Sequence, residues 1–316
     1  MPNIPEVVCI GFSTTDVLAR GVGEIPLGGS TAYVQSVGMA VGGDALNQAT
    51  VLARLGHKSG LITMVGDDAQ GRFILDECGK AGVDVSACVV SKHYPTSTSI
   101  VLITEDGERS FISQKNGTAD EQDASEIDLS YLRQGVKAVS IGSLFCSARL
   151  DSGIPRILKR ARELGAVTLA DMVPNHAGAS LKRIRGVLSL IDYVVPSKEE
   201  ALLYTGKATV EEAVDKFIAY GVKNVVVKLG GQGVMAKTPD GVITVKPYPA
   251  NVVDTTGAGD NFVAGFISGI LRGLSLEECL KFGSATASVS IGSVGATTGV
   301  KAFAQVQAVI QNEEAK

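Results

Sequence analysis

The residues best suited to chemistry lie near the C-terminal end of the chain, in the stretch Val252–Phe262. A short β-branched run leads into two threonines and a Gly-Ala-Gly-Asp sequence that ends at Asp260. Apolar residues at three- and four-residue steps then predict a helix. The free N–H groups and the dipole of a helix start favour anions, and Gly257 and Gly259 let the backbone approach one closely. Two interpretations of Asp260 follow: a base held beside an anion, or an ordinary helix cap.

A second glycine-rich helix start lies at Gly42 and Gly43. The apolar helix that it opens closes at Gly56, a position typical of a C-cap. Two adjacent glycines weaken a helix, so we favour close backbone approach to a ligand over a choice made for packing. Asn47 projects from the first turn, where its amide can bridge hydroxyl groups.

Further polar residues follow predicted strands. The apolar run Glu6–Gly11 predicts a buried strand, and Asp16 comes just past its end, as a ligand-binding acid or as a solvated loop acid. Ser197 with Glu200 follows the strand predicted at 193–197, and Gly230-Gly231-Gln232-Gly233 ends the strand predicted at 224–231.

The pattern that positions these residues is an alternation of strands and helices. From about Val136 it predicts strands at 139–143, 167–171, 193–197 and 224–231, and helices at 153–164, 198–204 and 210–220. Such alternation indicates an α/β fold with a doubly wound, mostly parallel sheet flanked by helices. The carboxyl ends of its strands converge on one edge, which favours Asp260 as a base. An anion hole beside a carboxylate suits phosphoryl transfer.

Two segments are predicted to leave this sheet. Leu18–Val41 has no helical period and is typical of a hairpin excursion. The strands predicted at Ser97–Ile103 and Arg109–Ser113 are joined by an Asp-Gly turn at Asp106. We expect the two hairpins to pair into a small sheet outside the core. Between them, Leu61–Asp68 is predicted as one strand and 71–81 as a helix.

Composition and missing motifs exclude several classes of protein. A chain of 316 residues can bury a large core in one or two domains. The net charge of −4 argues against nucleic-acid binding. Five scattered cysteines without a CxxC pair indicate free thiols in a reducing compartment, the three histidines show no metal spacing, and no apolar run predicts a membrane span. We therefore expect a cytoplasmic protein. P-loop, dinucleotide, GxSxG, HExxH and protein-kinase motifs are all missing from the sequence.

Two motifs carry a family resemblance: GGDALNQATVLARLG at 42–56 and DTTGAGDNFVAGF at 254–266. Through them the chain resembles the PfkB, or ribokinase-like, carbohydrate kinases along nearly its whole length. GGDALNQAT and SVGATTGVK are most similar to the YdjH-type branch of bacterial sugar kinases. The resemblance implies a single ribokinase-like kinase domain over 1–316, with a β lid formed by about 12–40 and 96–115.

The resemblance also implies roles for individual residues. Asp260 would be the general base, with the γ-phosphate in an anion hole formed by Gly257, Ala258 and Gly259. Sugar hydroxyls would be held by Asp16, Gly42, Gly43 and Asn47. The nucleotide-binding site would be lined by Ser197, Lys228, Gly230, Gly231, Gly233, Thr256 and Ser284. Glu200 would serve Mg2+ indirectly, and a K+ site would comprise Asp254, Thr256, Ser290, Ser293, Gly295 and Gly299.

Some positions depart from the family or stay open. Ser197 replaces a family asparagine that serves magnesium and phosphate. Asp44 stands where ribokinases often have lysine, which argues against ribose as the substrate. Arg109 is either a lid residue that contacts sugar or a substrate acid, or a solvated hairpin cation. Asp171 and Asn175 face phosphates, or they are caps or loop residues. Cys146 is interpreted as a core residue.

These expectations describe an ATP- and Mg2+-dependent kinase that transfers the γ-phosphate to a terminal hydroxyl of a small monosaccharide, a ketose or pentose. The alternatives are a nucleoside kinase, for which Tyr33, Tyr94 and Phe111 offer stacking surfaces, and a 2-keto-3-deoxy sugar acid kinase that uses Arg109. A catalytically silent sugar-binding regulator is the third. The expected partner is the sugar itself, with a homodimer through the lid because unpaired sheet edges tend to be covered.

Overall fold

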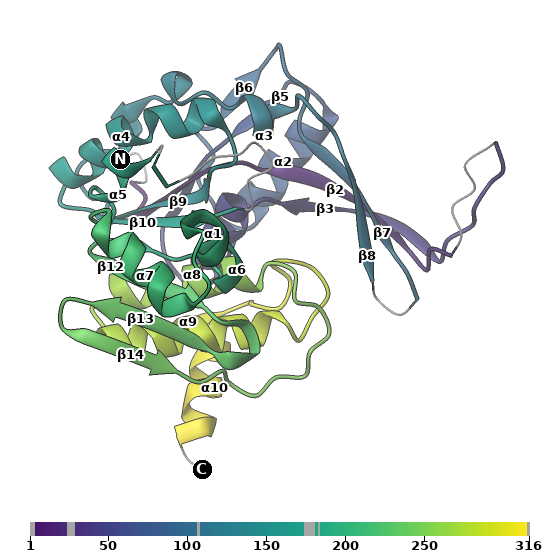
Figure 1. The fold of residues 1–316 in the computed structure, drawn as a ribbon. Helices are drawn as coiled ribbons and strands as arrows, with labels where there is room; N and C mark the ends of the chain where they lie inside the picture. Colours follow the sequence, from purple (N-terminus) through teal and green to yellow (C-terminus); the bar gives the residue numbers. More distant parts are fainter. Residues whose placement is uncertain (1–3, 24–28, 106–107, 174–180, 183, 315–316) are drawn as a thin grey trace.

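The main sheet has eight strands, in the order β14-β13-β12-β11-β10-β9-β1-β4 (Figure 1). The computed structural model describes residues 4–23, 29–105, 108–173, 181–182 and 184–314. Strands β12 to β4 of this order run parallel, and β13 and β14 add an antiparallel edge. Their bounds are β1 Val7–Ile10, β4 Ser59–Ile62, β9 Ala138–Leu144, β10 Val167–Met172, β11 Tyr193–Val194, β12 Asn224–Lys228, β13 Val234–Thr238 and β14 Gly241–Val245.

Helices cover both faces of this sheet, so successive strand residues enter two different hydrophobic clusters. In β1, Val7 and Cys9 face one cluster while Val8 and Ile10 face the other, and all four are fully buried. Burial on both faces explains why the parallel strands are continuous apolar runs. The first cluster includes side chains of α1 Asp44–Arg54, α2 Ala69–Lys80, α8 Ala258–Leu271, α9 Leu276–Ser290 and α10 Phe303–Glu314. The second includes those of α4 Ala148–Glu163, α5 Arg185–Leu188, α6 Lys198–Thr205 and α7 Val210–Ala219.

A separate four-stranded sheet projects from the body of the molecule (Figure 1). Its order is β3-β2-β7-β8, with bounds β2 Thr14–Arg20, β3 Ser36–Gly42, β7 Thr98–Ile103 and β8 Arg109–Ser113. The two predicted hairpins pair through β2 and β7, which run parallel. The Asp106-Gly107 turn lies outside the described residues. Short elements connect the two sheets: β5 Met64–Gly66, β6 Val89–Ser91, α3 Thr118–Glu121, and 3-10 turns at Ala124–Glu126 and Leu129–Tyr131.

Several boundaries differ from the predictions. The stretch Leu61–Asp68 is two strands, because the backbone leaves β1 at Thr63, whose carbonyl accepts the amide of Val89 at 2.8 Å, and β5 then pairs with β6. Helix α4 begins at Ala148, five residues early, after the Ser147 cap. The β13–β14 hairpin has no counterpart among the predicted elements. No helix in the described part of the chain combines the length and apolar character that a membrane crossing requires.

Candidate active site

The start of helix α8, where the sequence predicts an anion hole, has a glycine cap and no side-chain capping hydrogen bond. Gly257 caps the helix in the left-handed region, with φ of 71°. A Cβ at this position would lie 2.8 Å from the carbonyl oxygen of Ala296, so only glycine fits. The Asn261 side chain fixes the turn, because its Nδ2 donates to the carbonyls of Gly257 and Ala296, each at 2.7 Å. The first-turn N–H groups of α8 therefore keep one orientation.

Asp260 lies in this first turn and is 7% exposed. Asn47 on α1 donates from Nδ2 to Asp260 Oδ2 at 2.7 Å, which joins the two glycine-rich motifs. Burial raises the pKa of Asp260, while the Asn47 hydrogen bond and the charge of Lys228 oppose the shift. Asn47 Oδ1 is buried without a hydrogen-bond partner among the described residues. A buried acceptor of this kind calls for a donor, such as an incoming hydroxyl.

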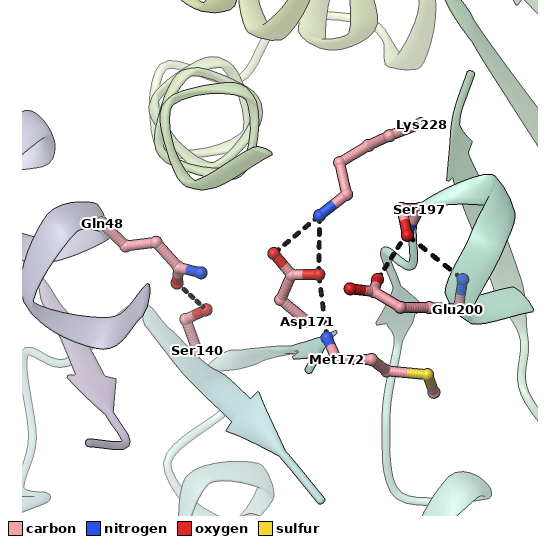
Figure 2. Close-up of polar contacts among 7 residues, drawn as sticks. All are labelled: Gln48, Ser140, Asp171, Met172, Ser197, Glu200 and Lys228. Atoms are coloured by element: carbon pink, nitrogen blue, oxygen red, sulfur yellow. Dashed lines mark hydrogen bonds and ion pairs between the residues drawn. The ribbon is translucent and has the colours of Figure 1, made fainter. Parts of the chain in front are cut away.

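A buried ion pair lies beside the helix start (Figure 2). Lys228 ends β12, and its Nζ lies 2.7 and 2.8 Å from the two carboxylate oxygens of Asp171 on β10. A Cβ built on Gly259 would lie 3.2 Å from Lys228 Nζ, so the ammonium adjoins the first turn of α8. Asp171 is therefore a strand residue that holds the Lys228 ammonium, and not a cap or loop residue, while its approach to phosphates stays a prediction. Asn175 lies outside the described residues.

The charges around Lys228 influence one another. Burial lowers the pKa of Lys228, but the carboxylates of Asp171 and Glu200 outweigh it, and the net direction is upward. Burial raises the pKa of Asp171 to about 6, against the opposing charge of Lys228. Burial also raises the pKa of Asp44, the half-buried first residue of α1, and the nearby charges of Asp260 and Asp171 raise it further. Asp44 thus belongs to the same acidic surroundings, although its motif position gave no sign of that.

Ser197 and Glu200 form a capping box at the start of α6, also drawn in Figure 2. Glu200 Oε2 accepts the Ser197 amide at 2.7 Å, and Ser197 Oγ accepts the Glu200 amide at 3.2 Å. The Ser197 hydroxyl is therefore engaged in a local cap. Burial raises the pKa of Glu200, and the charge of Lys228 opposes this. Among the described residues, no group of three or more His, Cys, Asp or Glu side chains is arranged to hold a metal.

A cavity of about 440 Å³ opens beside Lys228 and the start of α8. Five residues expected at the nucleotide line it: Lys228, Gly230, Gly231, Gly233 and Ser284. Ala258 and Gly259 lie in its wall, together with apolar side chains such as Phe262 and Ile291. Ser197 and Thr256 are not in its wall, and Thr255 lines it instead. The cavity therefore joins an apolar slot to a cation and a helix N-terminus.

The four-stranded sheet contributes Asp16, which lies against the Gly-Gly motif that begins α1. Asp16 lies within β2, so it is a strand residue and not a loop acid, and burial raises its pKa to about 6 while Arg109 opposes the shift. Its Oδ2 lies 2.8 Å from where a Cβ on Gly42 would stand, which brings the carboxylate against the Gly-Gly backbone. Gly43 has φ of 105°, and a Cβ there would lie 2.5 Å from the carbonyl oxygen of Phe12.

Two serines extend this polar face. Ser99 on β7 is in register with Asp16, and Ser113 on β8 is in register with Ser99. Their hydroxyl oxygens lie 3.0 Å apart. Neither serine was among the predicted site residues, since their placement depends on a strand register that one hairpin turn does not define. Across β2, β7 and β8 the sheet thus carries one row of a carboxylate and two hydroxyls.

Arg109 is not the solvated hairpin cation that was one of its two interpretations, and its contact with a sugar or a substrate acid stays a prediction. Its Nη2 lies 2.6 Å from Asp254 Oδ2, and its side chain is 23% exposed. Asp254 also accepts the amides of Thr256 at 2.9 Å and Gly295 at 2.7 Å. Burial raises the pKa of Asp254, but the hydrogen bonds from Gly295, Thr256 and Arg109 outweigh it and lower the pKa to about 2. Arg109 therefore ties the projecting sheet to the loop before α8.

The residues expected at a K+ site lie on the loop before α8 and on the segment that runs from Ser290, the end of α9, to Gly299. The amide of Asp254 donates to the Ile291 carbonyl, and a Cβ on Gly299 would lie 2.7 Å from the Ser290 carbonyl oxygen.

Cys146 is half-buried, and its Sγ donates to the Ala119 carbonyl at 3.6 Å. Burial raises the pKa of its thiol, which fits a structural residue.

Comparison with known proteins places this geometry in context. A family model described as "pfkB family carbohydrate kinase" matches residues 5–302. The chain is 30% identical to a 5-dehydro-2-deoxygluconokinase of Clostridium perfringens, over 97% of this chain and 91% of that protein. It is 29% identical to a ribokinase of Arabidopsis thaliana, over 93% of this chain and 78% of that protein. These comparisons do not confirm the YdjH-type branch, which stays a prediction.

Solved structures agree with these relatives. The A. thaliana ribokinase in complex with ribose and ATP superposes with a TM-score of 0.86 at 27% identity, over 97% of this chain and 99% of that one. A candidate ribokinase II of E. coli, in complex with ATP and Mg2+, gives a TM-score of 0.84 at 26% identity, over 98% and 99%. The ribokinase-like α/β fold expected from the sequence is confirmed.

Proposed function

The chain belongs to the pfkB family of carbohydrate kinases, phosphotransferases with an alcohol group as acceptor, and from this premise we propose that it transfers the γ-phosphate of ATP to a terminal hydroxyl of a small monosaccharide, a ketose or pentose. One observation carries the proposal. Asp260 is buried in the first turn of α8 and accepts a hydrogen bond from Asn47, and its neighbours Ala258 and Gly259 line the cavity.

In this proposal Asp260 removes the proton of the acceptor hydroxyl as general base. Asn47 orients the Asp260 carboxylate and offers its unpartnered Oδ1 to a hydroxyl. The N–H groups at the start of α8, opened by Gly257, Ala258 and Gly259, receive charge on the transferring phosphoryl group. Lys228 adds a fixed cation next to Gly259, and Asp171 keeps that cation oriented.

ATP fits the cavity by its chemistry. Its walls combine apolar side chains for a base with glycines and the Lys228 ammonium for phosphates. A relative at 26% identity binds ATP and Mg2+, which supports the same pair here. Since the described residues offer no three-carboxylate cage, they fit a Mg2+ held by phosphates and water, with Glu200 as the nearby carboxylate. The ion would supply positive charge to the phosphates.

The sugar class follows from charges at the acceptor side. Arg109 is paired with Asp254, so its charge is already compensated, and the surrounding groups are Asp16, Ser99 and Ser113. Carboxylates and hydroxyls suit a neutral polyol. A sugar acid is the second candidate because the C. perfringens relative is named for one, but it would have to displace Arg109 from Asp254. A nucleoside kinase and a silent regulator are supported by no specific contact.

We also infer that two copies of the chain associate through the projecting sheet. Register places Val37 and Met39 of β3, Ile100 of β7 and Ile112 of β8 on the face opposite Asp16. These side chains are 67%, 53%, 41% and 57% exposed, respectively. A contiguous apolar sheet face is typical of an interaction surface, and a second copy offers the matching apolar face.

A substrate panel tests the proposed reaction. Purified protein with ATP and Mg2+ would be offered neutral ketoses, pentoses, sugar acids and nucleosides, with ADP formation as the readout. We expect a neutral ketose or pentose to give the highest kcat/KM. A sugar acid with the highest value would establish the second candidate. Sugar-dependent thermal stabilisation with no ADP from any compound would instead establish a silent regulator.

A further inference from the structure

The carboxylate of Asp254 is fully engaged within the chain. Its Oδ1 accepts the amide of Thr256 at 2.9 Å, and its Oδ2 accepts the amide of Gly295 at 2.7 Å and the guanidinium of Arg109 at 2.6 Å. The Asp254 side chain is 3% exposed. A buried carboxylate needs compensation, and here a side chain from the projecting sheet supplies the full opposing charge.

This arrangement bears on the monovalent cation that the family resemblance implies. The expected ligands lie on the loop before α8 and in the segment from the end of α9 onward, but Asp254 is the single carboxylate in that set, and the other members offer carbonyl or hydroxyl oxygens. K+ at this carboxylate would stand beside the Arg109 guanidinium, and two cations on one buried anion repel each other. The Gly299 carbonyl already accepts Gln305 Nε2 at 3.1 Å. In charge, the residues present therefore do not fit K+.

The Arg109–Asp254 ion pair links the projecting sheet to the start of α8. Arg109 is the first residue of β8, whereas Asp254 comes three residues before the Gly257 cap of α8. Through its bonds to Thr256 and Gly295, Asp254 joins the two loops that flank this cap, since Gly257 packs against Ala296. A cation at Asp254 thus holds the anion site in shape.

We propose that the Arg109 guanidinium replaces a monovalent cation at Asp254, so that this kinase orders its anion site without K+ and couples that order to the projecting sheet. The proposal rests on the proposed kinase function for its catalytic meaning. Its structural content, a tethered cation in place of a free one, stands independently of turnover. Arg109 is accordingly a positioning residue, since it acts through Asp254 and not on the phosphoryl group.

The test compares K+ with tetramethylammonium at constant ionic strength, from zero to 100 mM, in the full-length protein. Two readouts are followed: the melting temperature without nucleotide, and kcat with the best substrate of the panel. For the wild type we expect no saturable K+ shift of the melting temperature and less than about a twofold change in kcat. A saturable stabilisation by K+, or activation of several fold, would overturn the proposal.

Variants of Arg109 then separate the effect of its positive charge from that of the rest of its side chain. In Arg109→Gln the carboxylate loses its partner, so we expect kcat to fall about tenfold or more and K+, but not tetramethylammonium, to restore both kcat and melting temperature. Arg109→Lys keeps a tethered charge and should remain insensitive to K+. Arg72→Gln, which removes an exposed arginine near Asp67, is the matched control and should behave as the wild type.

Each outcome of the variant series bears on the inference. Failure of K+ to stabilise Arg109→Gln would contradict it, even if the kinase assay is inactive with every sugar. If Arg109→Gln does not fold, the K+ response of the wild type and of Arg109→Lys still decides. If the wild type forms no ADP with any sugar and K+ does not shift its melting temperature, the result would instead count against the proposed function and leave the tethered cation supported.

Discussion

At Asp260 two opposing influences set the protonation state of the proposed base. Burial raises the pKa of its carboxyl, whereas the hydrogen bond from Asn47 lowers it. The balance determines the pH at which the carboxylate forms. Because the proposed reaction needs the charged form, activity should be lost as the pH falls through the pKa of Asp260.

Asn47→Ala tests this balance. Removing a donor that favours the carboxylate raises the pKa of Asp260, so activity should be lost at a higher pH during acidification. A hydrogen bond to a charged group contributes about 1.5–3 kcal/mol, which corresponds to about 1–2 pH units on the acidic limb of kcat/KM. The control is Asn224→Ala, whose amide donates to the Asp192 carbonyl. An acidic limb that does not move would show that Asn47 does not tune Asp260.

The sequence was informative at this scale where glycines and acids fall in one short motif. Gly257 and Asp260 could be interpreted from the helix start alone, because the helix N-terminus and the glycine requirement are local physics. The Lys228–Asp171 pair joins residues 57 positions apart and depends on a lysine that reaches across β11. The Arg109–Asp254 pair likewise needs the projecting sheet in place. Such long-range side-chain pairs follow from tertiary packing, not from spacing.

At the scale of elements, the start of α8 combines a left-handed residue with a close contact. Gly257 has φ of 71° and no room for a Cβ against Ala296. Gly230 also has a positive φ, 58°, but nothing lies within 4 Å of the Cβ that an alanine would add. The two positions therefore separate backbone conformation from steric fit.

Gly257→Ala and Gly230→Ala form a matched pair in urea unfolding. The left-handed backbone alone costs alanine about 1 kcal/mol, which is the loss expected for Gly230→Ala. Gly257→Ala adds a clash of about 1–3 kcal/mol, for a total of about 2–4 kcal/mol, and should also lower kcat because the anion site is displaced. Equal destabilisation of the two variants would show that the contact with Ala296 relaxes at no cost.

Regular elements were predictable where the pattern was long and its ends were marked. Gly43 and Gly56 bracket α1 as expected, and β7 and β8 fall within one residue of their predicted bounds. The change of sheet at Thr63 was missed because the apolar run continues through it while the pairing partner changes from β1 to β6. The β13–β14 hairpin has a half-exposed, mixed pattern that weakens the alternation signal.

At the scale of the whole molecule, the projecting sheet has two unlike faces. One carries the polar row of Asp16, Ser99 and Ser113 together with the exposed Phe111, and the other carries the exposed side chains of Val37, Met39, Ile100 and Ile112. The two faces give the sheet two proposed tasks: to cover the acceptor and to meet a second copy.

Ile112→Lys tests the second task. A charge within a paired apolar face remains without a partner on association, so we expect a dimeric wild type and a monomeric variant in sedimentation equilibrium. Val242→Lys places the same charge at an equally exposed site on β14 and should leave the dimer intact. A monomeric wild type, or a dimer that survives Ile112→Lys, would rule out association through this face.

The central claim, that Asp260 is the general base of a sugar kinase, is tested most directly by Asp260→Asn. Turnover with the best substrate and sugar affinity by calorimetry would be measured side by side. We expect kcat to fall by about 10²–10⁴, the typical contribution of a general base, while the sugar dissociation constant changes by no more than a few fold. Asp215→Asn on the surface of α7 is the matched control. Turnover near that of the wild type in Asp260→Asn would contradict the account.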